Sequence, residues 1–178
     1  MTLFGSKING GDIDIGVIAL PYSLKKMLTQ VFWKEDFYWI SHKDNNSSRE
    51  SVKSDEINKD GLMLLEDGHC LKDQVADLCN LTISSSLNMS ASSLNTLVEL
   101  VAGKMGSTLV PELSLEQLVN KNNMLQKAHL DEPGPHRELA FAYRKGFKGQ
   151  KDVELLKDLF YEELSNHFKG SYPVRMQR

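Results

Sequence analysis

The chain has 178 residues, of which 40% are hydrophobic and 25% charged, and its formal net charge is −3. These values are ordinary for a globular domain with its own core, and they give no overall electrostatic case for binding nucleic acid. The charge is uneven, because residues 1–120 hold 10 basic and 16 acidic side chains whereas residues 121–178 hold 11 basic and 8 acidic ones. We interpret the basic C-terminal part as a solvated helix face, with a partner-binding face as the alternative.

The composition indicates neither a membrane protein nor a secreted disulfide scaffold. The sequence contains no run of about 18 apolar residues, which a transmembrane helix would need. Residues 1–11 lack the layout of a signal peptide, and two cysteines are too few for a disulfide framework. We therefore expect a cytoplasmic protein with reduced thiols and no membrane partner.

Short strands are predicted in the first third of the chain. The β-branched apolar run at 13–20 predicts a mostly buried strand. The aromatic segment 31–41 predicts one or two strands, with a turn at 34–36. The polar segment 43–60 predicts a surface loop that contains one helical turn near residues 54–57.

Strands and helices alternate along the remaining sequence, which argues for an α/β fold. An apolar run at 62–65 predicts a buried strand, and the residues 70–79 that follow it predict a helix. Ser92 or Ser93 caps a further helix, whose apolar residues recur at i, i+3, i+4 and i+7 through Val101. The other expected elements are strands at 81–83, 107–110 and 139–143 and a final helix over 152–168.

Cys70 and Cys79 are the two cysteines of the chain, nine residues apart on the helix predicted for 70–79. Nine helical residues correspond to ~13.5 Å of rise and place the two side chains on roughly opposite faces. A disulfide needs Cα atoms closer than ~7 Å. The pair therefore cannot bond unless the helix melts, which is the physical form of a redox switch.

Cys70 is the better candidate for a reactive thiol. It would lie in the first turn of its helix, where partial positive charge and unpaired N–H groups favour the thiolate. His69 and Lys72 can add positive charge. A thiolate attacks peroxide to give a sulfenic acid, which condenses with a second thiol. Cys79 is the only second thiol in the sequence.

Other chemistries have less support in the residues. Both cysteines could be small core hydrophobes, which is a common fate of free cysteine. A zinc site is worse supported, because Cys-x8-Cys does not supply the usual ligand pairs. His136 is predicted to lie in a loop, and we expect no metal, no cofactor and no enzymatic activity. The five histidines, which form no close-spaced cluster, are His42, His69, His129, His136 and His167.

The segment Glu66-Asp67-Gly68-His69-Cys70-Leu71-Lys72-Asp73-Gln74, with Cys79 beyond it, closely resembles the redox segment of OxyR. OxyR is the peroxide-sensing branch of the LysR-type transcriptional regulators. Residues 91–111 resemble the helix and strand that line the effector cleft of that family, and residues 11–17 resemble the strand before its hinge. The resemblance extends over residues 8–168.

This resemblance implies an α/β fold of two lobes, like a periplasmic binding protein, with crossing strands between them. Residues 1–21 would form part of the first lobe, residues 22–124 a complete second lobe, and residues 125–178 the return to the first lobe with the C-terminal helix. The first lobe would be partial, because its opening strand–helix units have no counterpart in the sequence.

The resemblance also implies roles for individual residues. Cys70 would be the peroxide-reactive cysteine and Cys79 the resolving one. Lys72 stands where the family usually has arginine, so it keeps the charge but loses bidentate hydrogen bonding. The implied supporting residues are His69, Lys72 and Asp73, and the implied effector-cleft residues are Ser92, Ser93 and Thr108.

We therefore predict a redox-sensing regulatory domain of a LysR-type activator, in which hydrogen peroxide oxidises Cys70 and a Cys70–Cys79 disulfide results. The family implies dimers or tetramers, contact with RNA polymerase, and promoter DNA bound through a helix-turn-helix that these residues lack. The alternative is a ligand-binding LysR-type effector domain with structural cysteines only. A thiol peroxidase is a third hypothesis, which sustained turnover with added reductant would distinguish from a sensor.

Overall fold

The computed structural model describes residues 3–21, 27–45, 49–81 and 89–168. The chain divides into two compact units. The central unit comprises residues 35–137, and the discontinuous unit comprises residues 1–34 and 138–178. The chain thus passes between the units at 34–35 and again at 137–138. The lobe boundaries that the family resemblance implies, at 21–22 and 124–125, stay a prediction.

Strand pairing explains where the division falls. The discontinuous unit has a three-stranded sheet in the order β1-β9-β2. Its strands are β1 (Ile15–Leu20), β9 (Arg137–Arg144) and β2 (Met27–Glu35). Because β2 pairs in this sheet, the chain leaves the unit only at the end of that strand. The strands predicted at 13–20 and 139–143 are confirmed.

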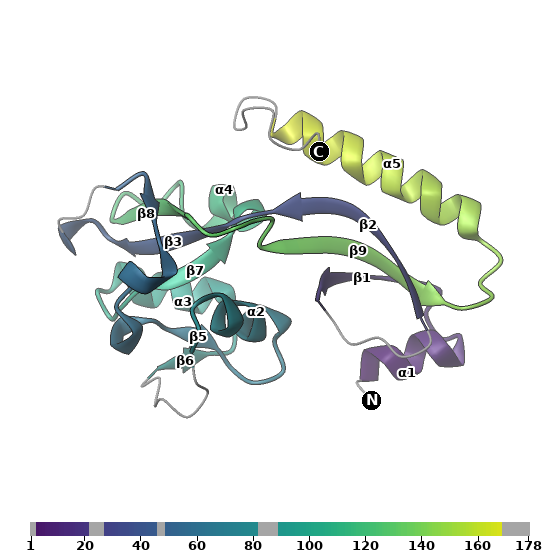
Figure 1. Ribbon diagram of the computed structural model, residues 1–178, viewed down its shortest axis with the longest axis horizontal. Coiled ribbons are helices and arrows are strands. Elements are labelled where there is room, and N and C mark those ends of the chain that lie inside the picture. The colour runs from purple at the N-terminus through teal and green to yellow at the C-terminus, as the bar shows by residue number, and fades with distance from the viewer. Residues whose placement is uncertain (1–2, 22–26, 46–48, 82–88, 169–178) are drawn as a thin grey trace. The chain divides into compact units, whose positions relative to one another are not determined.

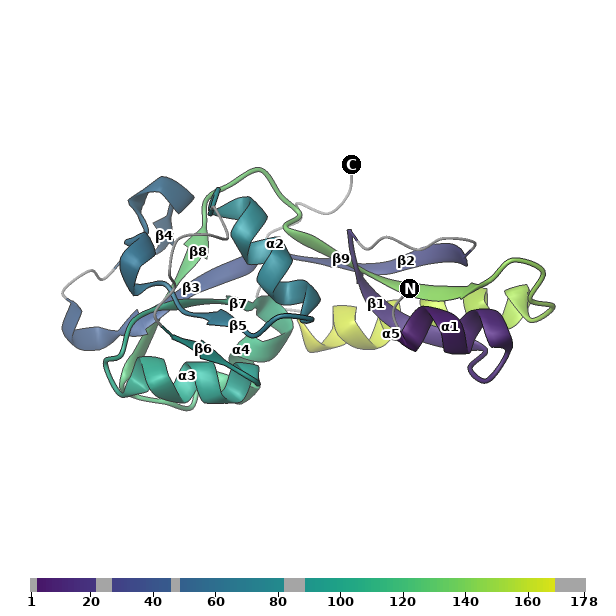
Figure 2. The same cartoon turned by 90° about the horizontal axis from the view of Figure 1, so that it is seen from below.

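Two helices cover opposite faces of this sheet, α1 (Leu3–Gly10) and α5 (Gln150–His167), as Figure 1 and Figure 2 show. Successive side chains of β9 point to opposite faces of the sheet, so this strand contributes to the packing against both helices. Ala140 and Ala142 pack with Ile8 of α1. Phe141 lies against Phe160 of α5, with ring centroids 5.2 Å apart.

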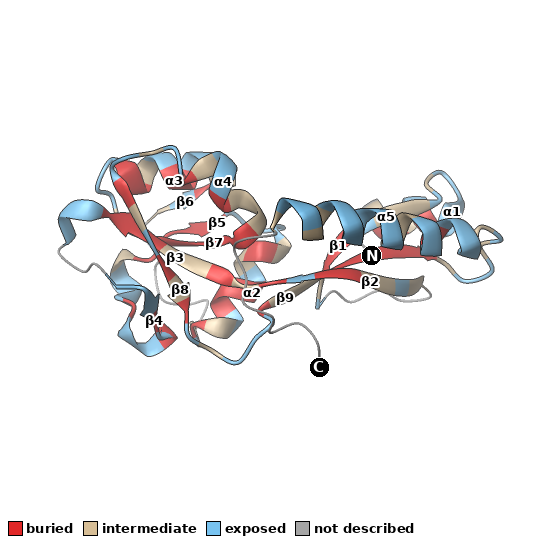
Figure 3. Ribbon diagram, turned by 90° about the horizontal axis from the view of Figure 1, so that it is seen from above, coloured by how far each residue is buried: buried red, intermediate tan, exposed pale blue. Residues whose placement is uncertain are grey.

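The final helix, predicted for 152–168, is confirmed as α5. Most of its surface is exposed (Figure 3), and Val153 is its buried residue. Asp152 lies in its first turn, where negative charge is favourable. In the part of the chain that the structure describes, no helix is both long and apolar enough to cross a membrane.

The central unit has a four-stranded sheet in the order β4-β8-β3-β7. Strand β3 runs antiparallel to both β7 and β8, and β4 runs parallel to β8. A short parallel pair, β5 and β6, lies apart from this sheet. The bounds are β3 (Phe37–His42), β4 (Ser51–Val52), β5 (Leu64–Leu65), β6 (Ser90–Ala91), β7 (Thr108–Pro111) and β8 (Leu125–Leu130).

Three helices complete the central unit: α2 (Cys70–Leu78), α3 (Leu94–Ala102) and α4 (Leu115–Leu118). The predicted serine cap is confirmed for α3, because Ser93 Oγ accepts a hydrogen bond from the Thr96 N–H at 3.1 Å. The apolar face of α3 packs against β3, β5, β6 and β7. The buried residues of that face are Leu97, Val98, Val101 and Ala102.

Some predicted elements differ in detail from those in the structure. The segment 31–41 forms two strands, β2 and β3, which only Asp36 separates. The predicted helical turn is a 3-10 turn at Ser54–Glu56. The strand expected at 81–83 falls mainly on residues outside the described ranges. Helix α1 and strand β8 were not predicted.

Replacing Gly106 with alanine is expected to destabilise the central unit by about 1–3 kcal/mol. A Cβ atom at this position would lie 2.4 Å from the carbonyl oxygen of Gly61. That oxygen accepts a hydrogen bond from the Ser107 N–H at 2.8 Å, beside the bridge that pairs Leu62 with Ser107. The clash would therefore displace a backbone contact that holds the β5 segment.

Urea unfolding measures this change, and Gly61→Ala is the matched control. A Cβ at Gly61 would meet only Asn58 Nδ2, at an ordinary 3.7 Å. The control is expected to change the free energy of unfolding by less than about 1 kcal/mol. Equal effects of the two substitutions would contradict the steric argument.

Candidate functional site

A tight turn places the cysteine helix behind a buried strand. Residues Leu62–Leu65, which include β5, are all buried, and the turn at 67–68 follows soon after them. Gly68 has φ of +94°, a conformation that glycine adopts without steric cost. His69 is the N-cap residue of α2, and Cys70 is its first residue. The helix predicted for 70–79 is thus confirmed, with Cys79 as its C-cap.

The two cysteines have different environments, and both are free thiols. Cys70 is half-buried in the first turn of α2. Cys79 is 1% exposed and packs in the core of the central unit. Burial raises the pKa of the Cys79 thiol to about 11, because the apolar core disfavours the thiolate. Cys79 in the folded helix is therefore a poor nucleophile.

The polar residues near Cys70 do not all face the thiol. Lys72 donates a hydrogen bond from Nζ to Asp67 Oδ1, at 2.5 Å. This contact lowers the pKa of the Asp67 carboxyl, first through the hydrogen bond and then through the charge of Lys72. His69 and Asp73 are exposed in the first turn of the helix. Their roles beside the reactive sulfur remain predictions.

Of the three residues expected to line an effector cleft, two make hydrogen bonds that stabilise the fold. Ser93 caps α3 through its hydroxyl. Thr108, which is 1% exposed, donates a hydrogen bond from Oγ1 to the Met63 carbonyl at 3.0 Å. Ser92 is exposed. An effector role for these three residues stays a prediction.

Alkylation of the native chain by iodoacetamide at about pH 8 is expected to be at least a hundredfold slower at Cys79 than at a small-molecule thiol, to order of magnitude. The reason is that a thiol with a pKa of about 11 holds only a trace of thiolate at that pH. Peptide mass analysis after timed labelling measures the rate, and a urea-unfolded sample is the control. Rapid native labelling of Cys79 would contradict its placement in the core.

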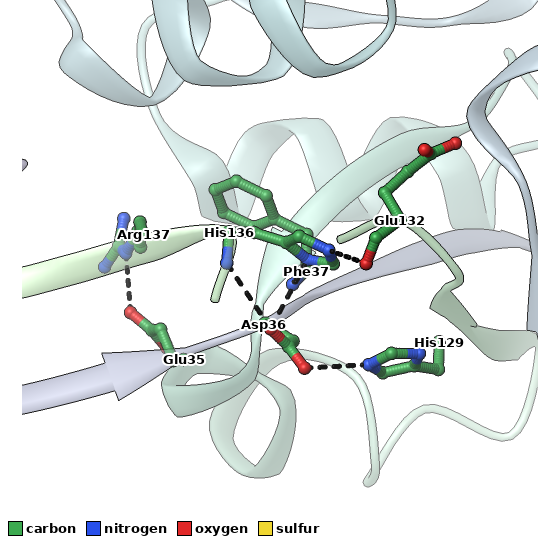
Figure 4. Close-up of polar contacts among 7 residues, drawn as sticks. All are labelled: Glu35, Asp36, Phe37, His129, Glu132, His136 and Arg137. Carbon is green, nitrogen blue, oxygen red and sulfur yellow. Dashed lines mark hydrogen bonds and ion pairs between the residues drawn. The ribbon is translucent and has the colours of Figure 1, made fainter. Parts of the chain in front are cut away.

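A second cluster of polar side chains lies where β2 ends, where β3 begins and just before β9 (Figure 4). Glu35, which is fully buried, binds Arg137 through Oε1 and accepts a hydrogen bond from the Leu113 N–H through Oε2 at 3.0 Å. The side chain of Arg137 is 14% exposed. This buried ion pair lies within the central unit and joins the last residue of β2 to the first residue of β9.

Asp36 and two histidines extend this cluster. Asp36 Oδ2 lies 2.9 Å from His129 Nε2, and Asp36 Oδ1 lies 3.7 Å from His136 Nδ1. His136 belongs to the loop before β9, as predicted, but it is buried. Sequence reasoning missed this cluster because its partners are about a hundred residues apart along the chain, and no local pattern connects them.

Among the described residues, no three His, Cys, Asp or Glu side chains converge in a way that could hold a metal ion.

Comparison with known proteins places the chain in a family. Residues 4–165 match the family described as LysR substrate binding domain. The chain belongs to this family. As a LysR substrate-binding domain, it is part of a family of transcriptional regulators rather than of enzymes.

Sequence relatives of this LysR substrate-binding domain include several peroxide regulators. A Streptomyces viridosporus protein named probable hydrogen peroxide-inducible genes activator is 29% identical over 174 residues, covering 96% of this chain and 54% of the relative. OxyR of Escherichia coli K12 is 26% identical over 165 residues, covering 92% and 54%. The HTH-type transcriptional regulator EstR of Acinetobacter baylyi is 32% identical over 154 residues, covering 86% and 51%. The chain thus spans about half the length of these relatives.

Solved structures agree with this assignment. The reduced OxyR regulatory domain of Pseudomonas aeruginosa has a TM-score of 0.74 and 28% identity, covering 88% of this chain and 76% of that one. A full-length OxyR variant from the same organism has a TM-score of 0.76 and 27% identity, covering 89% and 53%. The OxyR-like resemblance and the predicted α/β, periplasmic-binding-protein-like fold are both confirmed.

Proposed function

We propose that this chain is the peroxide-sensing part of an OxyR-like transcriptional regulator, with Cys70 as the oxidised thiol and Cys79 as the resolving one. The observation that carries the proposal is the motif from Glu66 to Gln74, with Cys70 at the start of α2 and Cys79 at its end. Family membership and the names of the relatives support the same function.

The proposed chemistry consumes one peroxide for each disulfide. The Cys70 thiolate attacks one peroxide oxygen, the O–O bond breaks, and the leaving hydroxide takes a proton to become water. Cys70 is then a sulfenic acid. The sulfur of Cys79 attacks that of Cys70, the S–O bond breaks, and a second water leaves as the disulfide forms. Both electrons that reduce the peroxide come from the two thiols.

The second step requires α2 to unfold. Its two cysteines are separated by ~13.5 Å of helical rise, whereas a disulfide needs Cα atoms within ~7 Å. Burial of Cys79 opposes the reaction as well, since the core disfavours its thiolate. Unfolding would remove both obstacles, because it shortens the separation and exposes Cys79 to water. The folded helix therefore keeps the reduced state stable until Cys70 is oxidised.

The proposal extends to the whole regulator. In a complete protein, a helix-turn-helix would bind promoter DNA, and disulfide formation in a dimer or tetramer would change the contact with DNA and RNA polymerase. We propose a cytoplasmic location for it, where reduced thiols persist between exposures to oxidant. The chain itself is proposed to sense peroxide and not to turn it over as an enzyme.

A brief pulse of stoichiometric hydrogen peroxide, followed by intact mass and peptide mapping, tests the proposal. The expected product is a Cys70–Cys79 disulfide with loss of two hydrogens, formed within seconds, with peroxide consumption ending after one equivalent. Continued consumption in the presence of a thiol reductant would indicate a peroxidase. Two free thiols after the pulse would refute peroxide sensing by this chain.

One observation favours a second candidate, a ligand-binding LysR-type domain whose cysteines are structural. Cys79 lies in the core as a small apolar residue would, and EstR, a relative at 32% identity, is not named for peroxide. In that case a Cys79→Ala variant would fold normally, and the peroxide pulse would leave Cys70 unpaired in the wild-type chain.

A further inference from the structure

His136 is a buried imidazole whose two nitrogens both have backbone partners (Figure 4). Its Nδ1 accepts a hydrogen bond from the Phe37 N–H at 2.8 Å. Its Nε2 lies 3.2 Å from the Glu132 carbonyl oxygen. A nitrogen that accepts from an N–H carries no proton, so His136 is the neutral tautomer with its hydrogen on Nε2, donated to that carbonyl. The side chain is fully buried and stacks on the Phe37 ring.

The same Nδ1 has a second possible partner. Asp36 Oδ1 lies 3.7 Å from it, just beyond hydrogen-bond length. If His136 gains a proton, Nδ1 becomes a donor and faces the Phe37 N–H, which is also a donor. Two donors cannot bond to one another, whereas Nδ1–H and the Asp36 carboxylate form a charge-assisted pair. A small movement of the ring therefore exchanges one partner for the other.

We propose that His136 is a proton-sensitive switch inside the central unit, beside the first residue of β3. Protonation exchanges the Phe37 N–H···Nδ1 hydrogen bond for an Nδ1–H···Asp36 pair. Phe37, the first residue of β3, then loses the acceptor that fixes its backbone. Asp36, Phe37 and His136 all belong to the central unit, so the exchange of partners takes place within that unit. The proposal does not depend on the cysteine chemistry.

The charged groups around His136 support this exchange. Asp36 already holds His129, which lies 2.9 Å from Oδ2, so its Oδ1 is the oxygen turned toward His136. The carboxylate of Glu132 is engaged elsewhere, because Oε1 accepts hydrogen bonds from the N–H and the hydroxyl of Ser54. The other nearby charged side chains are the Glu35–Arg137 ion pair and the buried Glu112, whose N–H donates to the Asp36 carbonyl.

Two nuclear magnetic resonance measurements on the reduced full chain test the switch as the sample is titrated from about pH 8 to about pH 5, the range in which histidine changes charge. Nitrogen chemical shifts of the imidazole report the protonation of His136. Hydrogen exchange of the Phe37 amide, corrected for its intrinsic pH dependence, reports the hydrogen bond. We expect protection of that amide to fall about tenfold with the same midpoint as His136.

Two asparagine variants assign the transition. In His136→Asn the amide Oδ1 takes the place of Nδ1 as an acceptor and does not titrate, so Phe37 should stay protected throughout. In His129→Asn the transition should persist. The proposal is overturned if His136 does not titrate in this range, if the Phe37 amide stays protected while His136 titrates, or if His129→Asn alone removes the transition. The wild-type titration decides the question even where a variant fails to fold.

Discussion

A Cys70→Ser chain is expected to yield no oxidised thiol with stoichiometric hydrogen peroxide, whereas a Cys79→Ser chain is expected to stop at the Cys70 sulfenic acid. A serine hydroxyl at position 70 cannot be oxidised by peroxide, and Cys79 is buried with a raised pKa of about 11. Its thiolate is therefore too scarce to react in the folded chain. Disulfide yield should fall from nearly complete to none in both variants, but for different reasons.

Trapping with dimedone, which reacts with sulfenic acids, separates the two variants by mass. Cys79→Ser should gain one adduct at Cys70, and Cys70→Ser should gain none. The wild-type chain should gain little, because Cys79 resolves the sulfenic acid first. An adduct on Cys79 in the Cys70→Ser chain would show that the assigned order of the two thiols is wrong.

Replacing Glu35 with alanine is expected to lower the free energy of unfolding by about 3–5 kcal/mol. Glu35 is fully buried, and its two oxygens bind the Arg137 guanidinium and the Leu113 N–H. The substitution leaves the largely buried guanidinium of Arg137 and the N–H of Leu113 without their carboxylate acceptor. The loss of one partner costs far more than the intact pair contributes, because the remaining charge stays out of water.

Urea unfolding followed by tryptophan fluorescence measures this effect, with Arg49→Ala as the control for an exposed ion pair. Arg49 and Glu56 are each 48% exposed at the side chain, so breaking their contact should cost less than about 1 kcal/mol. Glu35→Gln should fall between the two, since it keeps an acceptor but loses the charge. If Glu35→Ala and Arg49→Ala lowered the free energy of unfolding equally, the buried Glu35–Arg137 pair would not have the stabilising role argued for it.

Elements with strong local patterns could be predicted from the sequence. The apolar run before Pro21, the helix capped by Ser93 and the final helix each carry their signal within a few residues. Strand β8 does not, because its buried residues Leu125, Ala128 and Leu130 follow neither strict alternation nor a continuous apolar run. Its pairing with β3 and β4, which are distant from it in the sequence, determines its conformation.

Some residues of the candidate site could likewise be predicted from the sequence, and others could not. Cys70 and Cys79 belong to one continuous motif on one helix, so the sequence could identify them and their separation. The sequence could not show that Lys72 turns to Asp67 or that Cys79 lies in the core. The cluster of Glu35, Asp36, His129, His136 and Arg137 depends on strand pairing between distant segments, and it became visible only in the folded chain.

The central claim is that α2 must unfold for Cys70 and Cys79 to bond, and hydrogen–deuterium exchange of the reduced and oxidised chains tests it most directly. We expect the amides of Cys70–Leu78 to be protected in the reduced chain and to lose protection when the disulfide forms. Protection of α3 (Leu94–Ala102) should persist in both states. A disulfide-bonded chain in which α2 stays protected would contradict the account.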